Sequence, residues 1–176
     1  MTPKKDETLK LCAGSAELDP DKPFVLAGYG DGQLHENDPI TRAQFAVLLY
    51  RSLTDDSKAA LASSTSVFTD IAKDSWYHDA VSAFASVGVL NGCNGFFCPN
   101  DNLTYGQLIA ILTRFVDAKT ASMPDVSYTK HWAYKNIMTA AAYGWIQDAA
   151  SVQPDRIVTR GEVVELVNSI LERCKQ

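Results

Sequence analysis

The segment Pro39-Ile40-Thr41-Arg42-Ala43-Gln44-Phe45-Ala46-Val47-Leu48-Leu49 decides the fold, because it carries a helix start that the chain uses three times. Altered copies stand at residues 102–108 (NLTYGQL) and 157–163 (IVTRGEV). In each copy an apolar residue precedes Thr, and Gln or Glu follows the Thr three positions later. This is the pattern of a capping box with a hydrophobic staple. Three matches with shared flanking residues indicate an internal repeat.

The similarity extends to both sides of these helix starts. Downstream, apolar residues recur at the i, i+3, i+4 spacing of an amphipathic helix. They are Phe45, Leu48 and Leu49, then Leu108, Ile111 and Leu112, then Val163, Leu166 and Val167. Upstream, only the second and third copies share an Asp, a Trp and an Ala-rich stretch ending in Gly. These residues are Asp70, Trp76 and Gly88 in the second copy, and Asp125, Trp132 and Gly144 in the third.

The combined pattern resembles the S-layer homology domain. The shared features are an F-x-D motif, a Trp, an Ala-rich helix that ends in Gly, a Gly-Tyr-x-Asp-Gly turn, an x-F-x-P segment and a T-R-A-E helix start. Residues 28–32 (GYGDG) and 40–44 (ITRAQ) are close matches, and the resemblance covers residues 24–173. It implies a mainly all-α fold. Three repeats would form a pseudo-threefold unit around a central three-helix bundle, with short β-hairpins and loops outside.

We therefore expect one compact domain in four parts. Residues 1–23 are a divergent N-terminal segment, 24–66 a partial first repeat with a linker, 67–121 the second repeat and 122–176 the third. In the first copy, Pro20 and Pro23 stand where the Ala-rich helix would run, and Pro breaks a helix. We expect a short helix over residues 8–18 instead, and a polar linker with one helical turn over residues 54–66.

Composition excludes several classes of protein. The chain has 176 residues, of which 46% are hydrophobic and 21% charged, so it is ordinary globular material. It has no apolar run long enough to span a membrane. The net charge of −5 argues against a general nucleic-acid binder. The first six residues lack the apolar core of a signal peptide, so we expect a secreted protein to be represented here by a mature or trimmed piece.

Four cysteines allow two disulfides, Cys93–Cys98 and Cys12–Cys174. In a closed threefold array the first and last repeats are neighbours, so the Cys12–Cys174 bridge would join the two ends of the array. A two-residue Asn94-Gly95 turn would place Cys93 opposite Phe96, with Cys98 too distant on the diagonal. A wider loop would pair the two cysteines directly. The alternative is that the cysteines stay reduced and are buried as small apolar residues. The spacing argues against a zinc site, and we expect no metal.

Arg42 and Arg160 are the first candidates for ligand binding, because each follows the Thr that starts a helix. Exposed N–H groups at a helix start favour an anion, and a guanidinium can grip a carboxylate with two parallel hydrogen bonds. The resemblance implies a polysaccharide that can carry an acidic ketal on an amino sugar. The alternative is structural, with each Arg bound to an Asp or to the terminal carbonyls of a neighbouring helix. Tyr105 stands where the second copy should have its Arg.

Further candidates lie in the upstream halves and in the glycine-rich turn. Trp76 and Trp132 would stack on sugar rings, or else pack between repeats. Asp70 and Asp125 would accept hydrogen bonds from sugar hydroxyls, or else cap turns. The remaining candidates, which would either bring backbone and hydroxyl groups to a ligand or serve the turn alone, are Tyr29, Gly30 and Asp31.

The resemblance to the S-layer homology domain implies a noncovalent cell-surface anchoring module outside the cell, at the cell wall or S-layer. It would bind acidic, amino-sugar-containing cell-wall polysaccharide in grooves between repeats, without a cofactor or insertion into a membrane. We expect no catalysis, because no histidine or serine lies in a nucleophile or metal motif. The alternative is a protein-interaction or structural surface module with degenerate carbohydrate grooves and a protein partner on the cell surface. It is favoured by Tyr105, by the incomplete first copy and by the loss of glycines in the turn at residues 147–151.

Overall fold

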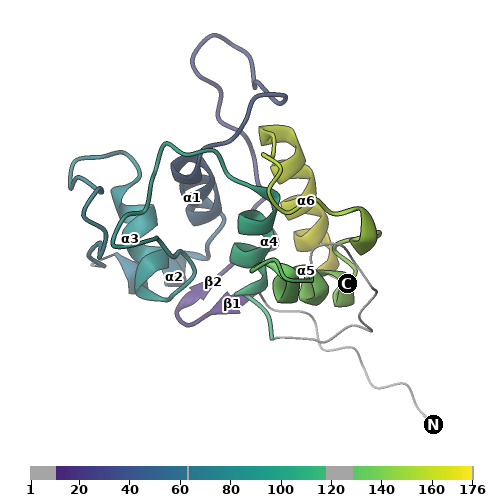
Figure 1. Ribbon diagram of the computed structural model, residues 1–176. Helices are drawn as coiled ribbons and strands as arrows, with labels where there is room; N and C mark the ends of the chain where they lie inside the picture. The colour runs from purple at the N-terminus through teal and green to yellow at the C-terminus, as the bar shows by residue number, and fades with distance from the viewer. Residues whose placement is uncertain (1–10, 63, 118–128, 176) are drawn as a thin grey trace.

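The computed structural model describes residues 11–62, 64–117 and 129–175 (Figure 1). It is mainly helical, as predicted. The elements are β1 (Cys12–Ala13), β2 (Ala16–Glu17), α1 (Arg42–Arg51), α2 (Asp55–Leu61), α3 (His78–Ser86), α4 (Tyr105–Thr113), α5 (Tyr134–Ala142), the 3-10 helix η1 (Ala149–Ser151) and α6 (Arg160–Arg173). β1 and β2 form an antiparallel pair. Each helix in the described residues is too short or too polar to span a lipid bilayer.

The three predicted capping boxes are formed. Thr41 accepts a hydrogen bond from the Gln44 backbone N–H, and the Gln44 side chain accepts one from the Thr41 N–H. Thr104 with Gln107 starts α4 in the same way, and Thr159 with Glu162 starts α6. Each box satisfies N–H groups that a helix start leaves unpaired. The sequence signal therefore marks the first residues of α1, α4 and α6 correctly.

The apolar residues in front of the three Thr residues are joined in a closed ring of backbone hydrogen bonds. Ile40 N–H donates to Val158 at 3.3 Å, Val158 N–H to Leu103 at 3.1 Å, and Leu103 N–H to Ile40 at 2.9 Å. All three side chains are fully buried. The ring brings together the N-terminal ends of α1, α4 and α6, although these helices are far apart in the sequence (Figure 1).

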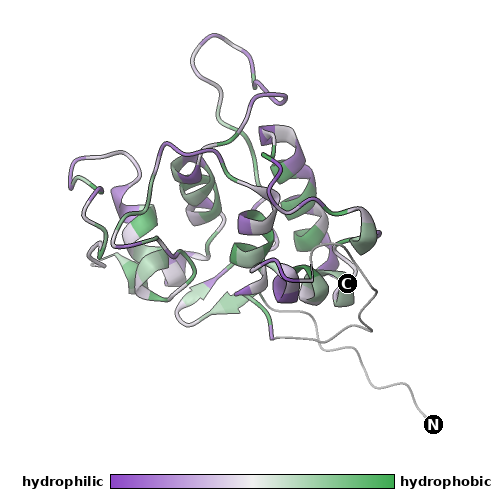
Figure 2. Cartoon of the chain, viewed as in Figure 1, coloured by the Kyte–Doolittle hydropathy of each residue, from purple (hydrophilic) through white to green (hydrophobic). Residues whose placement is uncertain are grey.

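The core lies between these helices and the Ala-rich helices that cover them. α3 packs against α1, and α5 packs against α4. Five Phe side chains are almost completely buried, namely Phe24, Phe45, Phe84, Phe97 and Phe115. Burial of each such side chain contributes about 1.5–3 kcal/mol to folding. Apolar residues accordingly line the inner faces of the helices (Figure 2).

Two local predictions are wrong. The described residues of the segment 8–18 form the β1–β2 hairpin and not a helix, because Gly14 makes the turn at a φ of +58° and Leu11, Ala13, Ala16 and Leu18 are buried. The expected linker contains a complete helix, α2, which Thr54 caps by accepting from the Ser57 N–H. Ser57 also accepts from the Glu17 N–H, which ties α2 to the hairpin.

The two predicted disulfides are also not formed in the part of the chain that the structure describes, which includes all four cysteines. Cys93 and Phe96 exchange backbone hydrogen bonds across a two-residue Asn-Gly turn, so Cys98 does not stand opposite Cys93. Cys174 is buried against its own helix and donates to the Ile170 carbonyl at 3.3 Å, whereas Cys12 is exposed. The cysteines are therefore reduced in this structure, but of the four only Cys174 is buried as the alternative expected.

Candidate functional site

Each capped helix begins against a loop from another copy of the repeat. At α1 the N–H groups of Arg42 and Ala43 donate to the carbonyls of Asp101 and Pro99, at 2.9 and 3.0 Å. Corresponding residues make the same pair of bonds at α6 and α4. They are Arg160 to Asp38 with Gly161 to Glu36, and Tyr105 to Arg156 with Gly106 to Pro154. These N–H groups are therefore occupied by the protein itself and do not offer the anion site that the helix starts suggested.

Arg42 lies almost completely buried in the loop of the second copy. Its Nε donates to Phe97 O at 2.8 Å and its Nη2 to Asn91 O at 3.0 Å. The guanidinium carbon lies 4.6 Å from the centre of the Phe97 ring, where a cation–π attraction adds to the hydrogen bonds. Burial lowers the Arg42 pKa, yet a guanidinium remains charged in proteins.

Arg160 lies in the loop of the first copy in the same manner. Nε donates to Leu34 O at 3.1 Å, Nη1 to the Tyr29 hydroxyl at 3.0 Å and Nη2 to Ala27 O at 2.7 Å. The guanidinium lies over the Tyr29 ring at 4.6 Å. Both arginines thus bind backbone carbonyls of loops, and not the Asp or the helix-terminal carbonyls that the structural alternative named.

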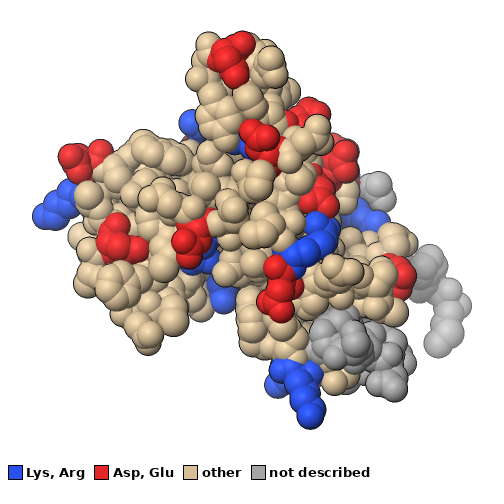
Figure 3. Space-filling view, turned by 45° about the horizontal axis from the view of Figure 1, so that its top comes forward, with Lys and Arg blue, Asp and Glu red and all other residues tan. Residues whose placement is uncertain are grey.

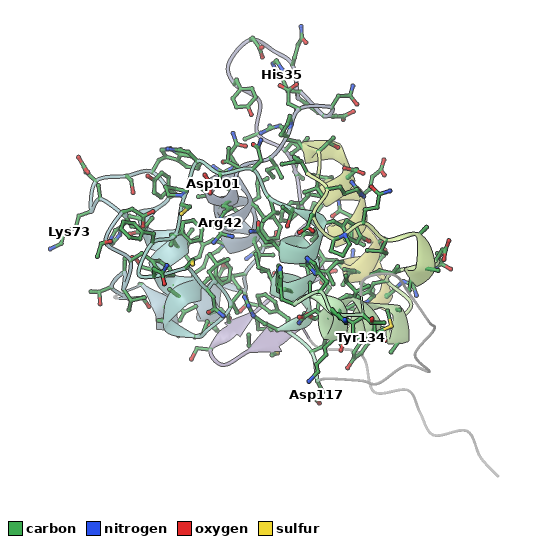
Figure 4. All side chains as sticks on the ribbon, viewed as in Figure 1. His35, Arg42, Lys73, Asp101, Asp117 and Tyr134 are labelled. Atoms are coloured by element: carbon green, nitrogen blue, oxygen red, sulfur yellow. The ribbon has the colours of Figure 1, made fainter. Side chains whose placement is uncertain are left out.

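A groove with a volume of about 540 Å³ opens beside Arg42, and we call it groove A. Its lining comes from all three copies: Arg42 from the first, the loop at residues 91–101 and the α4 side chains from the second, and Trp132 from the third. Figure 4 shows Arg42 and Asp101 close together at the start of α1. The full lining is Arg42, Asn91, Gly92, Cys93, Phe96, Phe97, Cys98, Asp101, Gln107, Ala110, Ile111, Arg114 and Trp132.

A second groove of about 210 Å³ lies beside Arg160, and we call it groove B. It is built from Ala27, Gly28, Tyr29, Gln44, Val47, Leu48, Arg51, Trp76 and Arg160. The two grooves use corresponding positions of different copies. The matching pairs are Arg42 with Arg160, Gln107 with Gln44, Ala110 with Val47, Ile111 with Leu48, Arg114 with Arg51, and Trp132 with Trp76.

The two Trp side chains are largely exposed at these grooves. Trp132 is 58% and Trp76 64% exposed. Each touches an aromatic neighbour, His131 at 5.3 Å and Tyr77 at 5.1 Å between ring centres. The alternative in which they are packed between repeats is therefore wrong, and their rings are accessible from the solvent.

Arg51 and Arg114 line the grooves but were not among the sequence candidates. Both stand ten residues after the Thr of their capping box, and that shared spacing was the available signal. Arg114 Nη1 donates to Val89 O at 2.6 Å, and burial together with the nearby Arg42 charge lowers its pKa. The Arg51 side chain is exposed and makes no hydrogen bond or ion pair within the described residues.

The other sequence candidates are divided between structural and accessible positions. Asp70 accepts from the N–H groups of Phe97 and Cys98 at 2.8 and 2.7 Å, so it fastens the loop of groove A. Tyr29 lines groove B, whereas Gly30 and Asp31 lie in the projecting loop and outside the groove lining. Asp125 lies outside the described residues. No group of three or more His, Cys, Asp or Glu in the described ranges could hold a metal ion.

The corresponding place beside Tyr105 differs, and we call it the third groove. It is lined by Tyr105, Leu108, Arg156, Val158, Glu162, Glu165, Leu166 and Ser169. Arg156 lies 4.7 Å over the Tyr105 ring and pairs with Glu162 at 2.8 Å. Ser169 occupies the position of Arg51 and Arg114. In the third groove the charge of Arg156 is therefore neutralised by Glu162, and the described lining of this groove includes no Trp.

Comparison with known families agrees with the repeat pattern. The model of the S-layer homology domain matches residues 67–109 and 127–164, which lie in the second and third copies. The chain belongs to the S-layer homology domain family. The first copy, at residues 24–66, lies outside both matched segments.

Several relatives have names that describe a surface or anchoring protein, and others, such as Exoglucanase XynX of Acetivibrio thermocellus, are named as enzymes. Cell surface glycoprotein 1 of Acetivibrio thermocellus is 30% identical over 165 residues, which cover 84% of this chain and 7% of the relative. The Cellulosome-anchoring protein of the same organism is 28% identical over 98% of this chain and 40% of its own length. The Surface-layer 125 kDa protein of Lysinibacillus sphaericus is 24% identical over 84% of this chain and 13% of its own length. The chain thus spans less than half of each of these relatives.

Proposed function

We propose that this chain is a noncatalytic module that anchors a protein to the bacterial cell surface by binding an acidic cell-wall polysaccharide in grooves A and B. The observation that carries the proposal is the repeated construction of the two grooves. Each combines a buried Arg, a second Arg and a solvent-facing Trp at corresponding positions. The family and the surface location implied by the relatives' names support the same function.

The chemistry of the lining suits a charged sugar. An exposed Trp face packs against the C–H face of a sugar ring. The second arginines, Arg114 and Arg51, present charge toward the groove and would meet the acidic group with N–H donors. Arg42 and Arg160 retain further N–H groups beyond those that hold the loops, and would assist. The Nε2 group of Gln107, whose Oε1 caps α4, offers a neutral donor in groove A.

The three copies would form a pseudo-threefold unit around the backbone ring of Ile40, Leu103 and Val158, with α1, α4 and α6 as the central bundle. Two of the three grooves would bind the polymer. The third would not, because Glu162 already occupies Arg156 and Tyr105 replaces the buried Arg. Acidic and basic side chains are interspersed over the face shown in Figure 3.

A second candidate function is binding of a protein partner at the cell surface. The third groove supports it, because its lining combines an aromatic ring, an ion pair and a further acid, Glu165, without the features of grooves A and B. This candidate would not require Arg51, Arg114 or either Trp.

Co-sedimentation with purified cell walls separates the two functions. We expect the chain to pellet with intact walls and to remain in solution after the walls are stripped of their secondary polysaccharide. Arg51→Ala and Arg114→Ala each should weaken pelleting, and the double variant should abolish it. Arg156→Ala in the third groove is the matched control and should pellet normally. Unchanged pelleting of the double variant, or of wild type on stripped walls, would contradict polysaccharide binding.

A further inference from the structure

The loops that cover Arg42 and Arg160 are fastened differently. The loop of groove A is held by Asp70, which binds the N–H groups of Phe97 and Cys98 from outside the loop. Glu7, which occupies the position of Asp70 in the first copy, lies outside the described residues. The loop of groove B, residues 27–38, projects from the body and contains its own fastening around His35 (Figure 4).

His35 stands between two carboxylates of its own loop. Its Nε2 lies 2.5 Å from Asp31 Oδ2, and its Nδ1 lies 3.1 Å from Asp38 Oδ2. A ring nitrogen donates only while it carries a proton, so both contacts together require the imidazolium form. The backbone of His35 has a φ of +53°, a left-handed conformation that is uncommon outside Gly and is held here by surrounding contacts.

Within the described residues, the charged and titratable groups around His35 come from its own loop and from α6. Asp31 and Asp38 come from the loop, and the Tyr29 ring meets the imidazole edge-on at 5.0 Å between centres. α6 contributes Arg160, which lies over the same Tyr29 ring. The hydrogen bond with Asp31 raises the pKa of His35, and the charges of Asp31 and Asp38 act in the same direction.

Two of the three groups that accept hydrogen bonds from Arg160 are neighbours of His35. Leu34, the preceding residue, supplies the carbonyl that accepts from Arg160 Nε. Tyr29 supplies the hydroxyl that accepts from Arg160 Nη1 and from Gln44 Nε2, both at 3.0 Å. Loss of one His35–carboxylate contact would therefore disturb Leu34 and Tyr29, which accept hydrogen bonds from Arg160 in the lining of groove B.

We propose that His35 is a positioning residue for groove B. While its imidazole is protonated, His35 holds Tyr29 and the Leu34 carbonyl against Arg160, and when the proton is lost these contacts with Arg160 loosen. The effect on ligand binding rests on the function proposed above. Groove B then binds more weakly as the pH rises through the His35 pKa. Groove A does not respond in this way, because Asp70 fastens its loop through backbone N–H groups that do not titrate.

The effect of His35 protonation on Arg160 is tested without a ligand. An NMR titration of the full chain from about pH 5.5 to about pH 8.5 would follow the His35 ring and the Nε–H signals of Arg160 and Arg42. We expect the Arg160 signal to shift with the same midpoint as His35, and the Arg42 signal to remain constant. An invariant Arg160 signal, or an unchanged Arg160 titration in His35→Gln, would overturn the proposal.

The coupling to binding is tested with purified walls at the same pH values. Arg42→Ala leaves groove B as the main site, and Arg160→Ala leaves groove A. We expect the affinity of the Arg42→Ala chain to fall several-fold with rising pH, and this fall to disappear when His35→Gln is added. An equal fall in the Arg160→Ala chain would refute the groove-specific effect. Absence of binding by every chain at every pH would defeat the proposed function, while the NMR titration would still decide the role of His35.

Discussion

Arg160 and Tyr29 are joined by two contacts at once, since Nη1 donates to the phenol oxygen at 3.0 Å and the guanidinium lies 4.6 Å above the ring. The residues come from opposite ends of the chain. Their contact attaches the loop of the first copy to the first turn of α6. It also leaves Tyr29 half exposed on the wall of groove B, so one residue serves both the fold and the candidate site.

Tyr29→Phe tests the hydroxyl alone, because the ring and its cation–π contact remain. We expect a loss of about 0.5–1.5 kcal/mol in the free energy of unfolding, the usual contribution of one hydrogen bond. Urea denaturation would measure it. Wall binding by the Arg42→Ala, Tyr29→Phe chain should be weaker than by Arg42→Ala alone. Equal stability and equal binding would show that the hydroxyl supports neither Arg160 nor Gln44.

Arg42→Ala and Arg51→Ala separate a buried arginine from an exposed one. Arg42 makes two charge-assisted hydrogen bonds to loop carbonyls, so we expect its loss to lower the free energy of unfolding by about 1.5–3 kcal/mol. Arg51→Ala should change that free energy by less than about 0.5 kcal/mol. Both variants should bind walls less tightly. A reversed order of stabilities in urea denaturation would contradict the assigned roles.

Asp70→Ala should open the wall of groove A. Its carboxylate is the partner of two backbone N–H groups, and we expect a loss of about 1.5–3 kcal/mol in the free energy of unfolding. Binding through groove A, measured in the Arg160→Ala background, should fall, whereas binding through groove B, measured with Arg42→Ala, should persist. Asp74→Ala, an exposed neighbour, is the control and should leave both grooves intact.

The free energy of unfolding should depend on pH through His35. The folded-state pKa of His35 is raised, so its contacts with Asp31 and Asp38 contribute stability below the unfolded-state pKa of about 6.5. That contribution is lost as the pH rises through the higher, folded-state pKa. The difference in unfolding free energy between wild type and His35→Gln should therefore be larger at about pH 5.5 than at about pH 8.5. A difference that grows with pH would have the wrong sign.

Thiol reactivity tests the absence of disulfides. The unfolded chain should react with four equivalents of a thiol reagent under nonreducing conditions, one for each cysteine. In the folded chain Cys93 is exposed and should react early. Cys174 should react last, because it is buried and burial raises its pKa, which lowers its thiolate fraction. Two equivalents in the unfolded chain would indicate one disulfide.

Local sequence patterns determined much of this protein. The capping boxes at Thr41, Thr104 and Thr159 depend on side chains three residues apart, so the sequence placed the first residues of α1, α4 and α6 correctly. The repeat also placed Trp76 and Trp132 at corresponding positions. The hairpin at residues 12–17 and the length of α2 were missed, because burial against other elements, and not local propensity, decides them.

Only the tertiary structure decided which copies meet. Arg42 lies in the loop of the second copy and Arg160 in the loop of the first, because the ring of Ile40, Leu103 and Val158 brings the three helix starts together. The same closure places Arg114 beside Arg42 and turns Arg156 onto Tyr105 and Glu162. A capping box is satisfied within one helical turn, whereas a groove built from three copies depends on contacts between residues far apart in the sequence. The sequence by itself therefore determined the helix starts and the family, and the closed ring decided which arginines became structural and which face the solvent.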